Sequence, residues 1–311
     1  MAQQSFDPGL TQQFGGKLRR AINKDGSFNV KRAGGDWRNL SLYLYLIRIP
    51  WTGFWAWVVL SYLLANTGFA IVYLLIGTQH LAGAETSTAA LRFWSAFFFS
   101  AHTLTTVGYG NMYPQGIAAN FLSAFEAMIG LLGFALATGL LFGRVSKPSA
   151  RIAFSEKLLI APYQDKTSLQ FRIANRRTNN MMELEAKVVL MTVDPNAPTL
   201  ARKYQELNLE RPSVYFFPLT WTVVHPIDSE SPLWGKTADD LKAMQAELLI
   251  LIKGFDDTFS QVVHARYSYR FDEIVWNAKF APAFHIDAHG DLILDTHRVS
   301  ELAKPEPSRI A

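Results

Sequence analysis

The sequence contains no cysteine among its 311 residues. Disulfide bonds, cysteine-ligated zinc, iron–sulfur clusters and thiol catalysis are therefore excluded. Charge is also scarce, because Asp, Glu, Lys and Arg make up 18% of the chain, against about 25% in average soluble proteins. The net charge is only +4, so no strong field for nucleic acid is expected. Hydrophobic residues make up 49% of the chain, which indicates a protein that is part membrane and part water-facing.

Basic residues are nearly missing from residues 49–143, which hold only Arg92. Two long apolar segments lie inside this stretch. Residues 51–77 carry no charged side chain, and residues 117–142 carry one, Glu126. A bilayer core needs about 20 apolar residues in a helix, so both segments are predicted to span a membrane. A secretory signal peptide is excluded, because the first segment begins after fifty residues and is too long.

Both sides of this stretch are rich in basic residues. By the positive-inside rule, both ends of the chain lie in the cytoplasm and residues 78–116 lie outside. Residues 36–50 place apolar side chains on one helical face, which predicts an interfacial helix, with an ordinary linker as the alternative. The flanking basic residues are Lys17, Arg19, Arg20, Lys24, Lys31, Arg32, Arg38 and Arg48 on one side and Arg144, Lys147 and Arg151 on the other.

A short apolar helix is predicted over residues 89–104, with a cap among Thr86, Ser87 and Thr88. Sixteen helical residues reach only ~24 Å, so this helix is expected to be re-entrant. Thr-Val-Gly-Tyr-Gly follows directly, at residues 106–110. Non-helical backbone at membrane depth is tolerated only where it is buried in protein or lines water. Its two glycines can take positive φ, so that successive carbonyls can point the same way and replace the hydration shell of a monovalent cation.

The order of helix, re-entrant helix, Thr-Val-Gly-Tyr-Gly and helix resembles the pore of a potassium channel. After Lys147 and Pro148 the pattern changes to period-two runs separated by turn residues, which predicts an all-β sandwich. These runs are Leu169–Ile173, Leu184–Val193, Val214–Val224, Ala246–Lys253, Gln261–Tyr269 and Asp291–Asp295.

Longer segments narrow the resemblance. LQFRIANRR, LTWTVVHPIDSESPLWG and VHARYSYRFDEIVW resemble the cytoplasmic domain of inward-rectifier potassium channels. FFFSAHTLTTVGYGNMYPQG and GLLGFALATGLLFGRVSKP most resemble the prokaryotic branch, the KirBac family. The resemblance covers residues 36–301, with pore and cytoplasmic motifs in the expected order.

The resemblance implies a membrane α-helical pore with a C-terminal immunoglobulin-like all-β sandwich, assembled as a tetramer. The domains would be a cytoplasmic N-terminus with an interfacial slide helix (1–50), a pore domain of two spans and a re-entrant pore helix (51–146), and the β domain with its tail (147–311). The implied partners are K⁺, anionic phospholipids and further copies of the chain, in a bacterial inner membrane. No catalytic set of residues is recognisable, so neither enzymatic activity nor a cofactor is expected.

Individual residues take their expected roles from the same resemblance. The resemblance implies that the selectivity filter, which supplies the K⁺ ligands, is formed by Thr106, Val107, Gly108, Tyr109 and Gly110. It implies that Phe134 lies in the pore cavity and that Phe142 forms the gate. It also implies that Glu185 and Asp257 line the cytoplasmic pore, and that anionic lipid is bound by Arg144, Lys147 and Arg151. Asn111 and His102 depart from the acidic residues that relatives often carry at these positions, which puts the usual support of the filter in doubt.

Glu126 is a carboxylate inside a predicted span, and such residues are costly and often functional. Bracing of the pore helix or filter loop by hydrogen bonds is favoured over a role in gating. Two alternatives to an inward rectifier are considered. A two-span channel with a nucleotide- or calcium-sensing domain would need βαβ periodicity and a glycine-rich loop, and neither is present. A non-conducting, membrane-anchored lipid sensor would keep the same sequence pattern.

Overall fold

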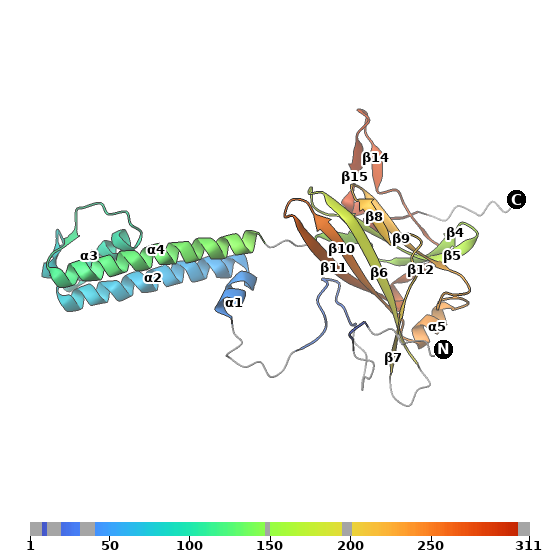
Figure 1. Ribbon diagram of the computed structural model, residues 1–311, viewed down its shortest axis with the longest axis horizontal. Helices are drawn as coiled ribbons and strands as arrows, with labels where there is room; N and C mark the ends of the chain where they lie inside the picture. The colour runs from blue at the N-terminus through green and yellow to red at the C-terminus, as the bar shows by residue number, and fades with distance from the viewer. Residues whose placement is uncertain (1–7, 11–19, 32–40, 147–149, 195–200, 304–311) are drawn as a thin grey trace. The chain divides into compact units, whose positions relative to one another are not determined.

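The computed structural model describes residues 8–10, 20–31, 41–146, 150–194 and 201–303 (Figure 1). The chain forms two compact units. One comprises residues 33–147, and the other joins residues 1–32 to residues 148–311. Lys147 and residues 36–40 of the expected slide helix lie outside the described residues.

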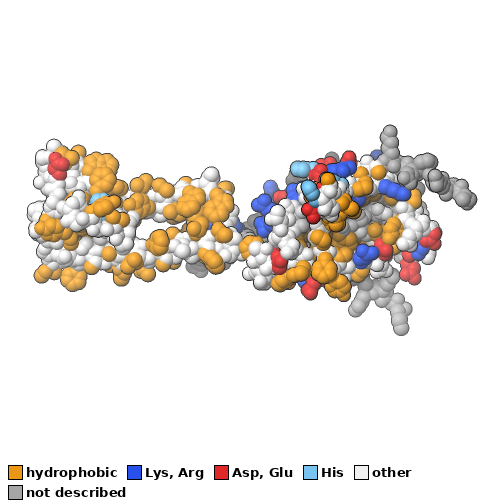
Figure 2. Space-filling model, turned by 90° about the horizontal axis from the view of Figure 1, so that it is seen from above, with side chains coloured by type: hydrophobic (Ala, Val, Ile, Leu, Met, Phe, Trp, Pro, Cys, Tyr) orange, Lys and Arg blue, Asp and Glu red, His pale blue; other side chains and the backbone are white. Residues whose placement is uncertain are grey.

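The helical unit is built around two long apolar helices, α2 (Trp51–Ile76) and α4 (Ile117–Val145). Both are long and apolar enough to cross a membrane, and their bounds agree closely with the predicted spans. At 1.5 Å per residue they reach about 39 Å and 44 Å. Few of their residues are buried, and the surface of these helices is dominated by hydrophobic side chains (Figure 2). Such a surface suits lipid or further protein chains.

Two shorter helices complete this unit. Helix α3 (Ala89–Leu104) has the predicted bounds, and its cap is Thr88, whose hydroxyl accepts a hydrogen bond from Leu91 N at 3.2 Å. Helix α1 (Leu42–Arg48) falls within the segment predicted to be interfacial. The turn η2 (Thr78–His80) and the paired strands β1 (Leu81–Ala82) and β2 (Tyr113–Pro114) close the loops around α3.

The second unit is a sandwich of two five-stranded sheets, which confirms the predicted fold class (Figure 1). In the first sheet the strand order is β11 (Gln261–Arg270), β10 (Glu247–Asp256), β6 (Met181–Val193) and β7 (Arg202–Glu206), and β8 (Ser213–Phe216) also pairs with β6. In the second sheet the order is β12 (Ile274–Trp276), β4 (Leu158–Tyr163), β5 (Lys166–Asn175) and β3 (Ile152–Phe154), and β9 (Thr220–Ile227) also pairs with β5. Inward-facing residues of both sheets, such as Phe171, Leu184, Ile250 and Tyr269, form one core.

Smaller elements surround the sandwich. They are α5 (Ala238–Ala243), η3 (Phe271–Glu273), η4 (Thr296–Ser300) and the strand pairs β13 (Lys279–Phe280) with β16 (Leu302–Ala303) and β14 (Phe284–Ile286) with β15 (Leu292–Leu294). The predicted run Val214–Val224 is wrong as a single strand, because β8 ends at Phe216 and β9 begins at Thr220. Pro218 lies in the gap and has no N–H for a strand ladder.

The described N-terminal residues 20–31 pack on the sandwich. Ala21 N donates to both oxygens of the buried Glu247, at 3.0 and 3.2 Å. Burial raises the pKa of the Glu247 carboxyl above its ordinary value. Glu273 pairs with Arg20 and with Lys24. Although burial opposes it, the hydrogen bond from Lys24 helps hold the pKa of Glu273 below its ordinary value.

Candidate functional site: the loop after α3 and the helix α4

The loop after α3 turns repeatedly through the left-handed backbone region. Thr106, Gly108 and Gly110 have φ values of 59°, 56° and 79°. Val107 N and Gly108 N both donate to the carbonyl of His102, at 2.9 and 3.3 Å. In the described part of the chain, no backbone hydrogen bond ends on the carbonyl oxygens of residues 106–109. These oxygens are therefore available to another ligand, such as a cation.

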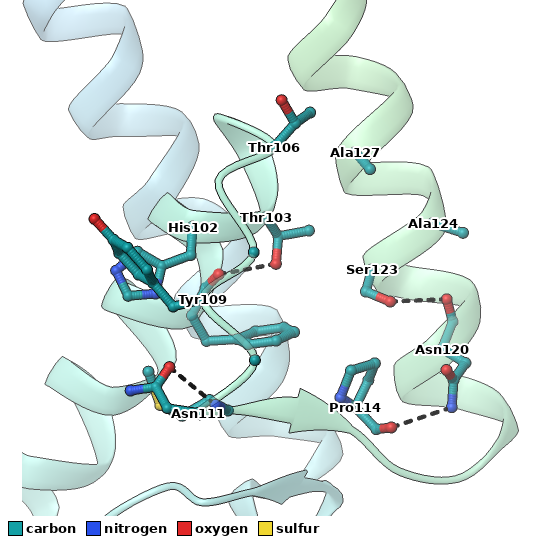
Figure 3. A pocket seen from close by; sticks show the side chains of 14 residues that line it. His102, Thr103, Thr106, Tyr109, Asn111, Pro114, Asn120, Ser123, Ala124 and Ala127 are labelled. Atoms are coloured by element: carbon teal, nitrogen blue, oxygen red, sulfur yellow. Dashed lines mark hydrogen bonds between the residues drawn. The ribbon is translucent and has the colours of Figure 1, made fainter.

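A cavity of about 480 Å³ lies between this loop and α4. Ser123, Ala124 and Ala127 line it from α4, and Figure 3 shows Thr106 and Tyr109 on its other side. The Tyr109 ring lies edge-on to His102, with 4.8 Å between the ring centroids. His102 therefore contacts the loop through its ring as well as through its carbonyl oxygen.

Two glycines permit close backbone approaches around the loop. A Cβ atom at Gly130 would lie 2.0 Å from the carbonyl oxygen of Leu104, the last residue of α3. A Cβ atom at Gly83, which has φ +80°, would lie 2.0 Å from the carbonyl oxygen of Asn111. Helix α4 and the loop before α3 can therefore touch the two ends of the candidate filter only because these residues lack side chains.

Glu126 is fully buried between the three longest helices. It accepts a hydrogen bond from Tyr73 of α2 at 2.8 Å and contacts Ser100 of α3. Asn66 of α2 lies 3.1 Å from the Ser100 hydroxyl. The favoured bracing role of Glu126 thus has partners in the structure. Asn66, Tyr73 and Ser100 were not among the residues predicted from the sequence, although a buried amide in an apolar span is itself a signal for helix–helix hydrogen bonds.

Phe134 and Phe142 are eight residues apart on α4, about 12 Å along the helix axis. Both side chains are largely exposed in the single chain. Gly133 and Gly139 are also open, since an added Cβ atom at either would meet nothing within 4 Å. This part of α4 therefore offers a bare surface with two projecting phenyl rings.

Arg144 lies in the last turn of α4 and contacts the C-terminal end of α1. Its guanidinium donates to the carbonyl of Leu46 and, at 2.7 Å, to the carbonyl of Ile49. It also lies over the rings of Trp51 and Phe54, 4.6 and 4.8 Å from their centroids. The carbonyls at a helix C-terminus lack partners within the helix, so Arg144 satisfies part of the end of α1.

We expect Arg144→Lys to loosen α1, because an ammonium cannot donate in the fork geometry of a guanidinium. Loss of the two hydrogen bonds and of the contacts with the aromatic rings should destabilise the packing of α1 by about 1–3 kcal/mol. Amide hydrogen exchange in residues 42–49 should accelerate, while exchange in the middle of α2 stays as in the wild type. Unchanged exchange in residues 42–49 would contradict this assignment.

Of the two residues expected in the cytoplasmic pore, Glu185 lies on a strand of the sandwich and Asp257 lies in the turn after a neighbouring strand. Glu185 on β6 has Lys187 and Lys253 at 3.8 and 3.6 Å. Asp257 follows β10, and Thr258 donates to its carboxylate at 3.3 Å. The two lysines offset the negative charge of Glu185. Arg151 is, with Arg144, one of the two described residues among those expected to bind anionic lipid, and its side chain is exposed shortly before β3.

The fold and the loop define a class of protein: a two-span membrane pore domain with a β-sandwich domain. The family model described as "Inward rectifier potassium channel C-terminal domain" matches residues 152–310. The family model described as "Ion channel" matches residues 57–147. The chain is 35% identical over 288 residues to the inward rectifier potassium channel Kirbac3.1 of Paramagnetospirillum magnetotacticum, covering 92% of this chain and 96% of that one. The chain therefore belongs to the inward rectifier potassium channel family.

More distant relatives include the G protein-activated inward rectifier potassium channel 1 of Gallus gallus and of Homo sapiens. The identities are 28% over 297 residues and 27% over 296 residues. The matches cover 88% and 87% of this chain but 60% and 58% of those proteins. This is a family of potassium channels, with K⁺ as the permeant ion, and not a family of enzymes.

Proposed function

We propose that the protein conducts K⁺ passively through a filter made by Thr106, Val107, Gly108, Tyr109 and Gly110. The observation that carries the proposal is the loop itself, where positive φ values alternate with ordinary ones and the carbonyls of residues 106–109 have no backbone partner in the described chain. Rings of such oxygens can replace the hydration shell of K⁺. Ions would lose water at these oxygens and cross in single file, without a cofactor.

One chain supplies one column of oxygens, so a ring requires a closed oligomer. We propose a homotetramer in which four copies of the helical unit surround the pore. The exposed apolar surfaces of α2 and α4 support this assembly, since they need lipid or other chains to cover them. Both chain ends would lie in the cytoplasm, with the pore domain at 51–146 in a bacterial inner membrane.

The gate is assigned to Phe142 and the pore cavity to Phe134. A ring of phenyl groups can close a pore by dewetting, because an ion cannot follow the water without losing its shell. Their exposure in the single chain supports this assignment, since the rings are free to face a common axis. An apolar cavity ring at Phe134 attracts no polyamine, so rectification by spermine is expected to be weak.

The sandwich is assigned the regulatory role. Glu185 and Asp257 would line its pore and meet K⁺ there, although Lys187 and Lys253 reduce the attraction at Glu185.

Arg144, Lys147 and Arg151 are proposed to bind anionic lipid head groups, and each basic residue near the membrane surface would contribute about 1 kcal/mol to this binding. Because the Arg144 guanidinium also holds α1, lipid bound there would act directly on the segment before the first span.

Ion flux into liposomes tests the proposal. Purified tetramers should pass K⁺ and Rb⁺ far better than Na⁺, and Ba²⁺ should block, since its size approximates that of K⁺ while its double charge makes it leave slowly. Adding anionic phosphoinositide to the liposomes should change the flux. Equal Na⁺ and K⁺ fluxes would contradict the filter assignment. Intact tetramers that bind anionic lipid but pass no ion would favour the membrane-anchored lipid sensor.

A further inference from the structure

A buried chain of hydrogen-bonding side chains crosses α2, α3 and α4. Asn66, Ser100 and Glu126 are fully buried, and Tyr73 is 1% exposed. Tyr73 Oη donates to Glu126 Oε2, and Ser100 Oγ contacts Glu126 Oε1 and Asn66 Oδ1. Neither the filter nor the gate assigned above uses these groups.

The direction of each hydrogen bond in this row of side chains can be worked out from Asn66, whose donor has a backbone partner. Asn66 Nδ2 donates to the carbonyl of Tyr62 at 2.8 Å, so the amide oxygen Oδ1 faces Ser100. The Ser100 hydroxyl carries one proton but faces two oxygens, Asn66 Oδ1 and Glu126 Oε1. Both contacts are hydrogen bonds only if Glu126 supplies a second proton to Ser100 Oγ.

The surroundings of Glu126 favour the same proton assignment. Among the described residues, no Lys, Arg or His forms an ion pair with its carboxyl group. A buried, unpaired carboxylate at membrane depth carries a large desolvation cost. A protonated carboxyl avoids that cost and completes the chain, in which Glu126 donates to Ser100, Ser100 donates to Asn66 and Asn66 donates to Tyr62.

This row of hydrogen-bonded side chains passes close to the loop that carries the proposed filter carbonyls. Ser100 lies two residues before His102, whose carbonyl accepts from Val107 N and Gly108 N. The Tyr73 ring also meets Phe99 edge-on, with centroids 5.1 Å apart. A shift of α3 along α4 would therefore break the Ser100–Glu126 contact and move the His102 carbonyl that orients the loop.

We propose that Glu126 is a neutral acid and a positioning residue of the pore, which locks α3 to both spans through Ser100, Asn66 and Tyr73 and so fixes the loop at residues 106–110. The role in ion selection rests on the proposed function. The neutral state of the carboxyl group does not depend on the proposed function, because it rests on the hydrogen-bond directions and on the burial of Glu126. Glu126 acts through Ser100 and α3 rather than by touching the ion.

The test compares Rb⁺ and Na⁺ flux through full-length tetramers in liposomes. Glu126→Gln should keep the wild-type ratio, because its Nε2 donates to Ser100 while its oxygen accepts from Tyr73. Glu126→Ala and Ser100→Ala should each lower the Rb⁺-over-Na⁺ ratio by about tenfold, since each leaves buried polar groups without partners. Ser61→Ala is the matched control, because the exposed Ser61 hydroxyl donates to the Val58 carbonyl of its own helix.

Each outcome decides one part of the proposal. Wild-type selectivity in Ser100→Ala or in an assembled Glu126→Ala variant overturns the positioning role, and Ser100→Ala decides it if Glu126→Ala fails to assemble. Loss of selectivity in Glu126→Gln shows that an ionised carboxylate is required and overturns the neutral state. A wild-type protein that does not discriminate between Rb⁺ and Na⁺ instead contradicts the proposed filter, and with it the role in ion selection.

An infrared spectrum tests the proton without any ion flux. The wild-type protein should show a protonated carboxyl C=O band that is missing from Glu126→Gln, and the Ser61→Ala spectrum should match the wild type. No difference in this band between the wild type and Glu126→Gln would overturn the neutral state, whatever the channel conducts.

Discussion

Gly130→Ala is expected to lower K⁺ flux strongly and to reduce the yield of the proposed folded tetramer. An alanine Cβ atom would lie 2.0 Å from the carbonyl oxygen of Leu104, which is backbone and cannot rotate away. Overpacking of this kind costs about 1–3 kcal/mol or more, which exceeds the ~1 kcal/mol that alanine gains over glycine in a helix. Relief requires α3 and α4 to separate, and α3 carries the loop with the candidate K⁺ ligands. Flux per reconstituted tetramer should fall by at least about tenfold, since 1.4 kcal/mol corresponds to that factor.

Gly133→Ala is the matched control for this substitution. It lies on the same helix, and its added Cβ atom would meet nothing within 4 Å of the same chain. This variant should assemble and be at least as thermally stable as the wild type. Equal flux and stability in Gly130→Ala and the wild type would contradict the contact between α4 and the end of α3.

Phe142→Ala is expected to raise basal Rb⁺ flux while K⁺-over-Na⁺ selectivity stays intact. Four phenyl rings near the end of α4 would make an apolar neck from which water withdraws, and removing them would widen and wet that neck. A gain of about tenfold in flux corresponds to ~1.4 kcal/mol of the permeation barrier. Selectivity should persist, because the loop at residues 106–110 lies beside residues 123–127 in the first half of α4, whereas Phe142 lies near the other end of that helix.

Leu136→Ala serves as the control for the gate, because it removes an exposed apolar side chain from the same helix. Its flux should equal that of the wild type. Phe134→Ala, measured beside it, reports on the cavity position. Unchanged flux in well-folded Phe142→Ala tetramers would place the closure elsewhere, either at Phe134 or in the sandwich.

The sequence alone determined the features that depend on neighbouring residues. Apolar runs predicted α2 and α4 because the length of a span is set by the thickness of the bilayer. The bounds of α3 followed from its apolar pattern and from a cap expected among Thr86, Ser87 and Thr88, of which the structure selects Thr88. Period-two runs predicted β5, β6, β10 and β11, where alternate side chains fill one core. The Thr-Val-Gly-Tyr-Gly motif and the basic flanks could be recognised for the same reason, since each is contiguous in the chain.

Tertiary structure alone decided the features that join distant residues. Glu126 meets Ser100 and Tyr73, which lie 26 and 53 residues away, and nothing local names such partners. Gly130 looks like any small residue of a span until Leu104 is placed against it. Arg144 belongs to a basic cluster in the sequence, but its donors are directed to Leu46 and Ile49. Periodicity reports which face of an element is apolar, whereas hydrogen bonds and close backbone contacts depend on how separate elements pack.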